Sequence, residues 1–345
     1  MKTEKDNFAY AVSRFFKIYL PGERGFSENT IASYRDTFKQ FLLYCQESLG
    51  IAPEKLKISD FSRKAVNGFL SKLETDGKSV STRNQRLAAL KSFFSYVKFA
   101  FPDFLNTASE ILAIRLKKQP EPVVSYLTDT AVACLLRQPD SSKKSGYRDM
   151  LILTLLYDSG ARVSEIIQIR IGDIRTQSPA TITLHGKGSK DRIVPLSEKT
   201  NALIKNYVLH ERLNRVDYKD KLLFVNHSGK PLTRAGVSYI LKKYAEMAKR
   251  ETPEQIPKKF SPHCLRHSKA MHLLQAGVAL IYIRDFLGHE SVKTTEVYAK
   301  ADSKSKRQAL ETAYTSVGSL SDPALTTSWN EDASLMAFLD RLCSK

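Results

Sequence analysis

The chain has 345 residues, is 42% hydrophobic by count, and carries 54 Lys and Arg against 36 Asp and Glu, a formal net charge of +18. This length allows two domains, each with its own core. The charge favours a polyanion as partner, because Lys and Arg that neutralise phosphates release counterions. The amino terminus is polar and the apolar runs are short, so we predict no signal peptide, no membrane span and a cytoplasmic protein.

Cysteine spacing gives no sign of a zinc knuckle or a disulfide framework. The four cysteines lie far apart in the sequence, which fits a reducing compartment. They are Cys45, Cys134, Cys264 and Cys343.

Residues 8–101 follow a helical pattern throughout. The stretch "SENTIASYRDTFKQFLLYC" begins with Ser27 and Asn29 as cap candidates, and "ISDFSRKAVNGFLSKL" predicts a second helix. A third, "STRNQRLAALKSFFSYVKF", has an apolar stripe at helical spacing, so we predict a small all-helical bundle. The apolar face of the first helix is Ile31, Tyr34, Phe38, Phe41 and Leu42, and the stripe of the third is Leu87, Leu90, Phe94 and Val97.

The third helix lies in a basic region. No Asp or Glu occurs between Gly77 and Pro102, whereas five basic residues do. A solvated helix face would explain them one by one, but the complete lack of acidic residues favours contact with DNA phosphates. The five are Lys78, Arg83, Arg86, Lys91 and Lys98.

A proline-bearing segment, "RLKKQPEPVVSYLTD", follows and is our candidate interdomain linker. Residues 148–174 then predict an apolar helix, a glycine-broken turn and a second amphipathic helix. The period changes in "ATITLHGKGSKDRIVPLS", where Ile182 and Leu184 alternate before a "GKGSK" turn, which predicts a hairpin. Helices return afterwards. We predict a helical domain over 1–105, a linker over 106–125, a second domain over 126–320 and a tail over 321–345.

The tail ends in a short apolar helix on a polar tether. It either folds back onto its own domain or docks on a neighbouring protomer, and a helix of this length suits both. Its apolar residues are Leu335, Phe338, Leu339 and Leu342.

Tyr298 lies in a polar stretch, "LGHESVKTTEVYAKA", that lacks the apolar pattern of a core tyrosine. We expect a polar, mobile segment that lets the hydroxyl reach a DNA phosphate. A tyrosine hydroxyl can attack a phosphodiester and form a covalent intermediate. Such a reaction needs arginines for the phosphoryl oxygens and a general acid for the leaving oxygen.

The chain offers these groups in compact motifs. Arg162 follows a helix-breaking glycine, Lys187 lies between two glycines of the hairpin turn, and His263 and Arg266 share one helical face. His289, which we expect to open a helix where the end donors favour an anion, precedes Tyr298. Each residue alone has an ordinary structural explanation, but their joint occurrence in a basic chain favours catalysis on DNA.

The ordered motifs "GARVSEI", "GKGSKDRIVPL", "HCLRH" and "LGHESVKTTEVY" resemble the catalytic domain of the tyrosine recombinases, the phage integrase family. The amino-terminal helices resemble that family's SAM-like core-binding domain. The resemblance implies a mainly α fold with a small β-sheet: a SAM-like helical core-binding domain plus a mixed α/β catalytic domain. The wording of "PLTRAGVSYIL" and "ASLMAFLDRL" is most similar to integrases and transposases of bacterial mobile elements.

The resemblance implies a role for each motif residue. Tyr298 is expected to form a 3′-phosphotyrosyl bond while Lys187 protonates the leaving 5′-oxygen. The two arginines, Arg162 and Arg266, are expected to hold the scissile phosphate. The remaining expectations are His263 and His289 at the phosphate or the tyrosine, Glu165 and His267 as supporting residues, and Lys190 and Arg192 as further DNA-binding residues.

We expect no cofactor and no metal, since several cationic donors can replace a divalent ion and carboxylates for two metals do not cluster in the sequence. The resemblance implies double-stranded DNA with inverted core sites, a tetramer on synapsed DNA, and an accessory directionality factor or co-encoded recombinase as partners. It also implies a Holliday junction.

Four alternatives stay open at this stage. They are an Xer-like dimer-resolving recombinase, a type IB topoisomerase, a DNA-binding protein without catalysis, and a zinc protein that uses His263 and His267. The last is disfavoured because Arg266, between the two histidines, would repel a cation.

Overall fold

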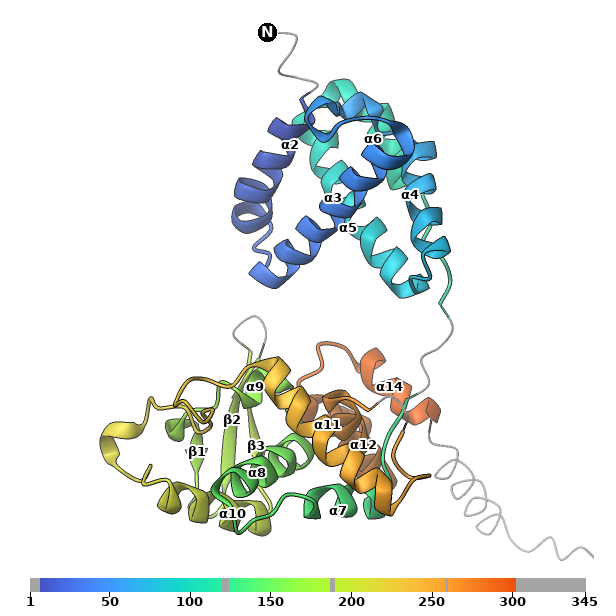
Figure 1. Ribbon diagram of the computed structural model, residues 1–345. Helices are drawn as coiled ribbons and strands as arrows, with labels where there is room; N and C mark the ends of the chain where they lie inside the picture. The colour runs from blue at the N-terminus through green and yellow to red at the C-terminus, as the bar shows by residue number, and fades with distance from the viewer. Residues whose placement is uncertain (1–6, 120–123, 187–189, 258–259, 302–345) are drawn as a thin grey trace, which may run out of the picture. The chain divides into compact units, whose positions relative to one another are not determined.

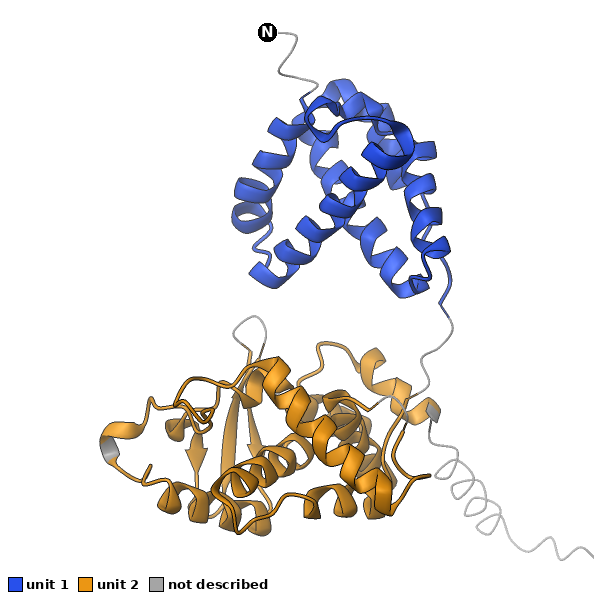
Figure 2. Ribbon diagram, in the orientation of Figure 1, with its two compact units in different colours: residues 1–122 blue, residues 123–345 orange. Residues whose placement is uncertain are grey.

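The computed structural model describes residues 7–119, 124–186, 190–257 and 260–301 (Figure 1). The chain divides into two compact units, residues 1–122 and 123–345, which are coloured separately in Figure 2. The predicted fold class, mainly α with one small β-sheet, is confirmed. No helix in these ranges is both long and apolar enough to cross a bilayer.

The first unit is a helical bundle with a phenylalanine-rich core. Ser62 and Ser79 each accept a hydrogen bond from a backbone amide of the helix they precede, as N-cap residues do. The rings of Phe41 and Phe61 stack with centroids 4.8 Å apart. The elements are α2 (Phe8–Arg14), a π-helical segment η1 (Phe15–Glu23), α3 (Glu28–Leu49), α4 (Arg63–Thr75), α5 (Val80–Ala100) and α6 (Leu105–Leu112), with short 3₁₀ turns at Pro53–Lys55, Ile58–Asp60 and Pro102–Phe104.

The predicted helices of this unit form, with one difference at a boundary. The third-helix stripe is buried as predicted, and Phe93 beside it is fully buried too. The second helix begins at Arg63, because residues 58–60 form a 3₁₀ turn that places Ile58 in the core before Ser62 caps α4.

The segment after the bundle also differs from expectation. Residues 106–125 were predicted to be a linker, yet Leu105–Leu112 is helical and packs on α5. Ala108, Ile111 and Ile114 belong to the bundle core, because an amphipathic turn of helix buries its apolar side wherever a core is available. The part of the segment that leaves the core therefore starts beyond Ile114.

The second unit joins a three-stranded antiparallel sheet to helices. The order is β1-β2-β3, and Ile182 pairs with Val194 in the register of β2 and β3. Ile182, Leu184 and Val194 lie in one core with the apolar side of α8, whereas Ile193 is exposed, so one sheet face is covered. The elements are α7 (Asp129–Arg137), α8 (Lys144–Asp158), α9 (Val163–Ile166), β1 (Ile174–Arg175), β2 (Thr181–His185), β3 (Asp191–Pro195), α10 (Glu198–His210), α11 (Arg234–Glu251), α12 (Pro262–Gln275), α13 (Leu280–Leu287) and α14 (Val292–Ala301), with 3₁₀ turns at Ile171–Asp173 and Val216–Tyr218.

The hairpin and most helices of this unit were predicted, but one detail was wrong. The amphipathic helix expected after the glycine-broken turn is only the four-residue α9, followed by a 3₁₀ turn at Ile171–Asp173. Helices return over 281–300 as predicted, and Gly288 in the left-handed conformation, φ +64°, ends the first of them, α13.

Asn84 on α5 fixes the start of the interdomain segment. Its Nδ2 donates to the Lys117 carbonyl at 2.8 Å, and its Oδ1 accepts from the Lys117 amide at 3.1 Å. Asn84 is buried, whereas Lys117 is exposed, so water can replace Asn84 at the two backbone groups of Lys117. The net loss for each hydrogen bond is about 0.5–1.5 kcal/mol.

We therefore expect Asn84→Ala to destabilise the first unit by about 1–3 kcal/mol. The measurement is hydrogen exchange of the α5 and Lys117 amides under native conditions, which should quicken at Lys117 most. Ser81→Ala, on an exposed position of the same helix, is the control. Equal exchange at Lys117 in wild type and Asn84→Ala would contradict this assignment.

Candidate active site

Three arginines from different elements converge on the carboxyl end of α13. Arg192 Nε donates to the Phe286 carbonyl at 2.9 Å, and Arg266 Nη2 donates to the Leu287 carbonyl at 2.6 Å. Arg162 Nη2 donates to the Gly288 carbonyl at 3.3 Å. The last carbonyls of a helix lack intrahelical partners and carry the negative end of its dipole. Three consecutive carbonyls therefore serve as acceptors for three cations. 

Two glycines allow this close packing. A Cβ on Gly288 would lie 3.1 Å from Arg192 Cδ, and its positive φ disfavours other residues. Gly160 has φ +56°, and a Cβ there would lie 2.8 Å from a Leu287 methyl. The Gly160 carbonyl accepts from Arg266 Nη1 at 2.6 Å, so the glycine-broken turn seen in the sequence positions an arginine of α12.

Glu165 is the carboxylate of this cluster. Its two oxygens accept from both terminal nitrogens of Arg192, at 2.9 and 2.8 Å, and from Arg162 Nη1 at 2.9 Å. It also accepts from the Arg162 amide at 2.8 Å, which caps α9. Burial alone would raise the pKa of Glu165, but the bonds from Arg192 and Arg162 outweigh it and lower the pKa. Glu165 is therefore ionised and fixes both arginines.

The cluster holds more positive than negative charge. Arg266 is 3% exposed, and burial, followed by the charges of Arg162 and Arg192, lowers its pKa to about 9. It still carries its proton at neutral pH. A partly open group of guanidinium forks suits a phosphate, which accepts bidentate hydrogen bonds.

The expectation that Tyr298 lies outside an apolar core was wrong. It is buried, 2% exposed, and packs with Met271, Ile283 and Leu287. The sequence around it contains little apolar mass, but the cluster that covers it comes from α12 and α13. Burial raises the pKa of Tyr298, opposed by Arg266 and Arg162, so the free protein holds a neutral phenol.

Three histidines surround the tyrosine. His267 Nδ1 lies 2.8 Å from the Tyr298 hydroxyl, and the His289 ring stacks on the Tyr298 ring with centroids 6.3 Å apart. His289 Nδ1 is hydrogen-bonded to Thr295 Oγ1 at 3.0 Å. His263 reaches solvent, with its ring centroid 6.3 Å from that of His267.

Two of these histidines are neutral at physiological pH. Burial lowers the pKa of His267 to about 4, helped by His263 and Arg266. Burial also lowers the pKa of His289 to about 4, followed by the effects of Arg266 and Arg162. Protein atoms packed round His263 lower its pKa as well, followed by Arg266, although its side chain is exposed.

The position expected for His289 was also wrong. It follows the α13 cap rather than opening a helix, and its amide donates to the Arg284 carbonyl at 3.0 Å. The glycine before it and the serine at position 291, whose hydroxyl accepts from the Lys293 amide, are the sequence signals of a helix end and a helix start. His289 therefore belongs to the connection between α13 and α14.

Lys187 lies outside the described residues, as does the predicted tail helix with Leu335, Phe338, Leu339 and Leu342. The structure does describe Gly186 and Lys190, which flank the hairpin turn. The Gly186 amide donates to the Lys190 carbonyl at 3.0 Å, and a Cβ on Gly186 would lie 3.9 Å from Glu165 Oε1. The turn that carries Lys187 therefore starts and ends beside the arginine cluster.

Three predicted DNA-binding arginines have partners within the protein. Arg83 is 7% exposed and pairs with Glu74 at 3.1 Å, and Arg192 is held by Glu165. Arg86 donates to Ser33 and Thr37 of α3. No acidic residue lies near Arg83 in its own helix, so the sequence analysis missed Glu74, which belongs to the preceding helix. Arg83 therefore joins α4 to α5.

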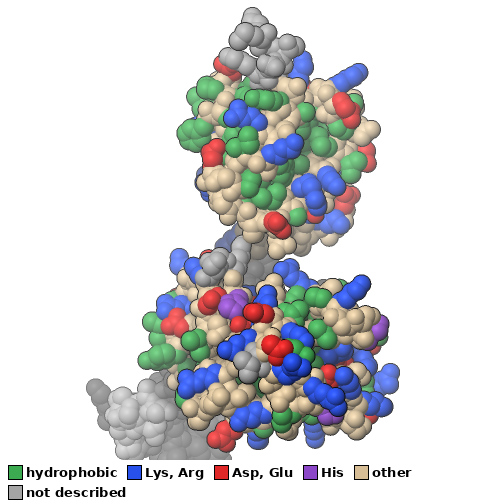
Figure 3. Space-filling view, turned by 90° about the vertical axis from the view of Figure 1, so that its left-hand side faces the viewer, with side chains coloured by type: hydrophobic (Ala, Val, Ile, Leu, Met, Phe, Trp, Pro, Cys, Tyr) green, Lys and Arg blue, Asp and Glu red, His purple; other side chains and the backbone are tan. Residues whose placement is uncertain are grey.

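The other predicted contacts remain accessible. Lys78 and Lys98 are exposed, Lys91 is half-buried, and Lys190 makes an exposed ion pair with Glu290 at 3.4 Å. Exposed pairs of this kind stabilise little. Figure 3 shows Lys and Arg side chains spread over one face of the second unit.

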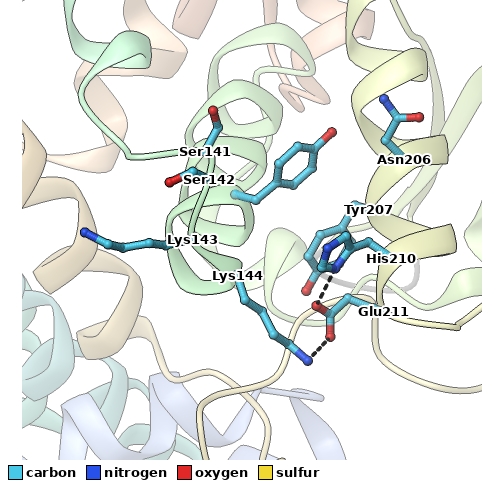
Figure 4. Close-up of a pocket in the computed structure, with 9 residues that line it drawn as sticks. Ser141, Ser142, Lys143, Lys144, Asn206, Tyr207, His210 and Glu211 are labelled. Atoms are coloured by element: carbon cyan, nitrogen blue, oxygen red, sulfur yellow. Dashed lines mark ion pairs between the residues drawn. The ribbon is translucent and has the colours of Figure 1, made fainter.

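A cavity of about 220 Å³ at the start of α8 contains no predicted catalytic residue. Figure 4 shows Lys144 and Glu211 paired there, at 2.8 Å, beside Tyr207 of α10. The arginine cluster adjoins the opposite end of α8, where Gly160 follows the C-cap residue Ser159. Within the described ranges no group of three or more His, Cys, Asp or Glu side chains could hold a metal ion.

Sequence reasoning missed three features of the site. It did not find the hydrogen bond between His267 and Tyr298, the buried Thr295 that orients His289, or the role of Arg192. Thr295 and Tyr298 are three apart on one helix, which is a usable signal. Arg192 gave none, because strand spacing alone does not tell which helix end faces a side chain.

The family is identified by sequence and structure together. The phage integrase family matches residues 125–305, and the phage integrase N-terminal SAM-like domain matches residues 14–99. The chain belongs to the phage integrase family of tyrosine recombinases.

Relatives and solved structures agree with this membership. The putative integrase/recombinase y4rC of Sinorhizobium fredii is 36% identical over 99% of this chain and 100% of its own length. The tyrosine recombinase XerD of Staphylococcus haemolyticus is 34% identical over 84% of this chain and 94% of its own. The XerH site-specific recombinase, bound to its difH substrate before cleavage, is 28% identical with a TM-score of 0.63, covering 81% of this chain and 78% of that chain.

Glu165 gives a prediction about stability and pH. Its folded pKa is lowered from the ordinary 4.5, so its contribution to stability is complete above that value and is lost as the pH falls through the lower folded pKa. Replacement of a buried ion-pair partner costs about 3–5 kcal/mol. We expect Glu165→Gln to lower stability at neutral pH and to flatten its decline in acid.

The measurement is thermal unfolding of wild type and variant between about pH 3 and pH 7, across the window that the shifted pKa defines. Glu198→Gln, at an exposed position of α10, is the matched control. Parallel curves for wild type and Glu165→Gln over this range would contradict the assignment.

Proposed function

We propose that this protein is a site-specific DNA recombinase of a mobile element, an integrase or transposase that cuts and rejoins DNA strands through a 3′-phosphotyrosyl intermediate. The observation that carries this proposal is the juxtaposition of Tyr298 with Arg162 and Arg266 around one helix end. The similarity to y4rC over nearly the whole chain supports the mobile-element assignment. The similarity to XerD supports an Xer-like dimer-resolving activity as the second candidate.

In the proposed reaction the Tyr298 oxygen attacks the scissile phosphorus and the bond to the 5′-oxygen breaks. Arg162 and Arg266 hold the phosphoryl oxygens, where negative charge grows in the transition state. Lys187 supplies the proton for the leaving oxygen, and His263 and His289 hydrogen-bond the phosphate. The phosphotyrosyl bond keeps the energy of the bond it replaces, so religation needs no nucleotide.

The chain's own side chains supply the charge stabilisation in this scheme. Loss of one preorganised donor of this kind typically reduces the rate by about 10²–10³-fold. Two arginines and a lysine can therefore account for a large part of the acceleration without a cofactor. Glu165 keeps Arg162 and Arg192 in place, so its role is positioning.

The proposed partners are double-stranded DNA with inverted core sites and further copies of this chain, as a tetramer on synapsed DNA. An accessory directionality factor or a co-encoded recombinase is part of this proposal, as is a Holliday-junction intermediate. The proposed location is the cytoplasm, where the DNA is. XerH is described in complexes with its difH substrate before and after cleavage.

The nucleophile is tested with suicide DNA that carries the ends of the native element. Wild type should form a protein–DNA adduct on a denaturing gel, and Tyr298→Phe should form none while it binds the same DNA. Tyr282→Phe, an exposed tyrosine of α13, should form the adduct. Tight binding by wild type without any adduct would refute cleavage by this chain.

The basic face of α5 gives a prediction about DNA affinity. Lys98→Ala should weaken binding about equally across sequences and reduce the slope of log K against log salt by about one. Arg83→Met should leave that slope unchanged, since Arg83 is paired with Glu74. The measurement is a salt titration of DNA binding. Equal slope changes in both variants would contradict the prediction that Lys98 contacts DNA and Arg83 does not.

A further inference from the structure

Among the described side chains, only His267 is hydrogen-bonded to the Tyr298 hydroxyl. The family resemblance gives His267 no more than a supporting role. His267 Nδ1 lies 2.8 Å from the hydroxyl oxygen. His289 instead stacks on the Tyr298 ring, and its Nδ1 is hydrogen-bonded to Thr295. His263 is one turn earlier on α12, on the solvent side.

We propose that His267 is a catalytic residue: it accepts the proton of the Tyr298 hydroxyl as the oxygen attacks phosphorus, and returns it during religation. This inference rests on the proposed function. In the forward step the O–H bond of Tyr298 breaks, an N–H bond forms at His267 Nδ1, and the Oη–P bond replaces the bond from phosphorus to the 5′-oxygen. The leaving oxygen takes its proton from Lys187, so protons balance.

The geometry suits a proton acceptor. A base must lie within about 2.6–3.2 Å of the oxygen it deprotonates, and His267 does so. With its proton on Nε2, the neutral ring offers an Nδ1 lone pair to the hydroxyl, which donates. His267 sits one residue after Arg266 on α12, so a single helix brings both the base and a phosphate-holding arginine to the nucleophile.

The surroundings keep His267 in the accepting form. Burial, followed by the charges of His263 and Arg266, lowers its pKa to about 4. Its base form is therefore complete at neutral pH, while the phenol is un-ionised because its own pKa is raised. The groups that face this pair are His263 and Arg266 of α12, Arg162, and His289 of the α13–α14 connection.

A weak base can still act on this phenol. As the oxygen bonds to phosphorus its proton becomes strongly acidic, so transfer to His267 becomes favourable late in the step. Arg266 and Arg162 also favour the phenolate charge. General base catalysis of this kind contributes about 10²–10⁴-fold.

The test compares His267→Asn with wild type on a suicide substrate whose scissile 5′-oxygen is replaced by sulfur. Asn can still accept a hydrogen bond near the Nδ1 position but cannot take the proton. The thiolate leaves without a general acid, so Lys187→Ala should cleave this substrate nearly as fast as wild type. His267→Asn should cleave the sulfur substrate about 10²-fold or more slowly than wild type.

Two further readouts separate a base from a structural residue. The wild-type rate on the sulfur substrate should be nearly constant from about pH 6 to pH 9, whereas the His267→Asn rate should rise about tenfold per pH unit, because its phenol must ionise first. Fluorotyrosine at position 298 ionises more easily than tyrosine. It should therefore raise the cleavage rate of His267→Asn more than that of wild type.

Binding affinity and melting temperature confirm that the variant is folded, and His210→Asn, an exposed histidine at the end of α10, is the matched control. If wild type forms no adduct with either substrate, the proposed function fails. If wild type cleaves and His267→Asn cleaves as fast or faster, with a flat pH profile, the proposed function stands and this inference is overturned.

Discussion

The site depends on one helix end that collects three arginines. The carbonyls of Phe286, Leu287 and Gly288 have no partners inside α13, and each accepts from a different guanidinium. Positive side chains repel one another, yet here the helix dipole and the buried carboxylate of Glu165 offset that repulsion. The cations are thereby fixed before any phosphate arrives, which is the condition for electrostatic preorganisation.

This arrangement explains why distant motifs must occur together. Arg162 comes from the turn after α8, Arg192 from β3 and Arg266 from α12, and the α13 end is their shared acceptor. A side chain at Gly288 would displace Arg192, because its Cβ would lie 3.1 Å from Arg192 Cδ. Gly288 therefore maintains the arginine cluster although it carries no side chain of its own.

The helical bundle and the hairpin could be predicted from the sequence because each depends on local periodicity, whereas the roles of the motif residues rest on the family resemblance and stay predictions. It did not predict that Tyr298 is buried, since the apolar atoms around it come from α12 and α13 rather than from its own helix. The pairing of Arg83 with Glu74 was missed for the same reason. Local composition determines elements, whereas burial and charge pairing depend on which elements meet.

The site combines neutral side chains around Tyr298 with cations around the end of α13, where the proposed reaction places the phosphate. Burial keeps His267 and Tyr298 uncharged, so the phenol is unreactive until its oxygen approaches phosphorus. The lowered pKa of Arg266 shows that its charge is held against desolvation and its two arginine neighbours. Glu165 alone does not neutralise the three arginines. A phosphate bound at this cluster adds negative charge and so raises the pKa of Arg266. By linkage, the protonated form of Arg266 binds the phosphate more tightly than a neutral form would. In the proposed reaction, phosphate binding and activation of Tyr298 therefore depend on the same excess of positive charge.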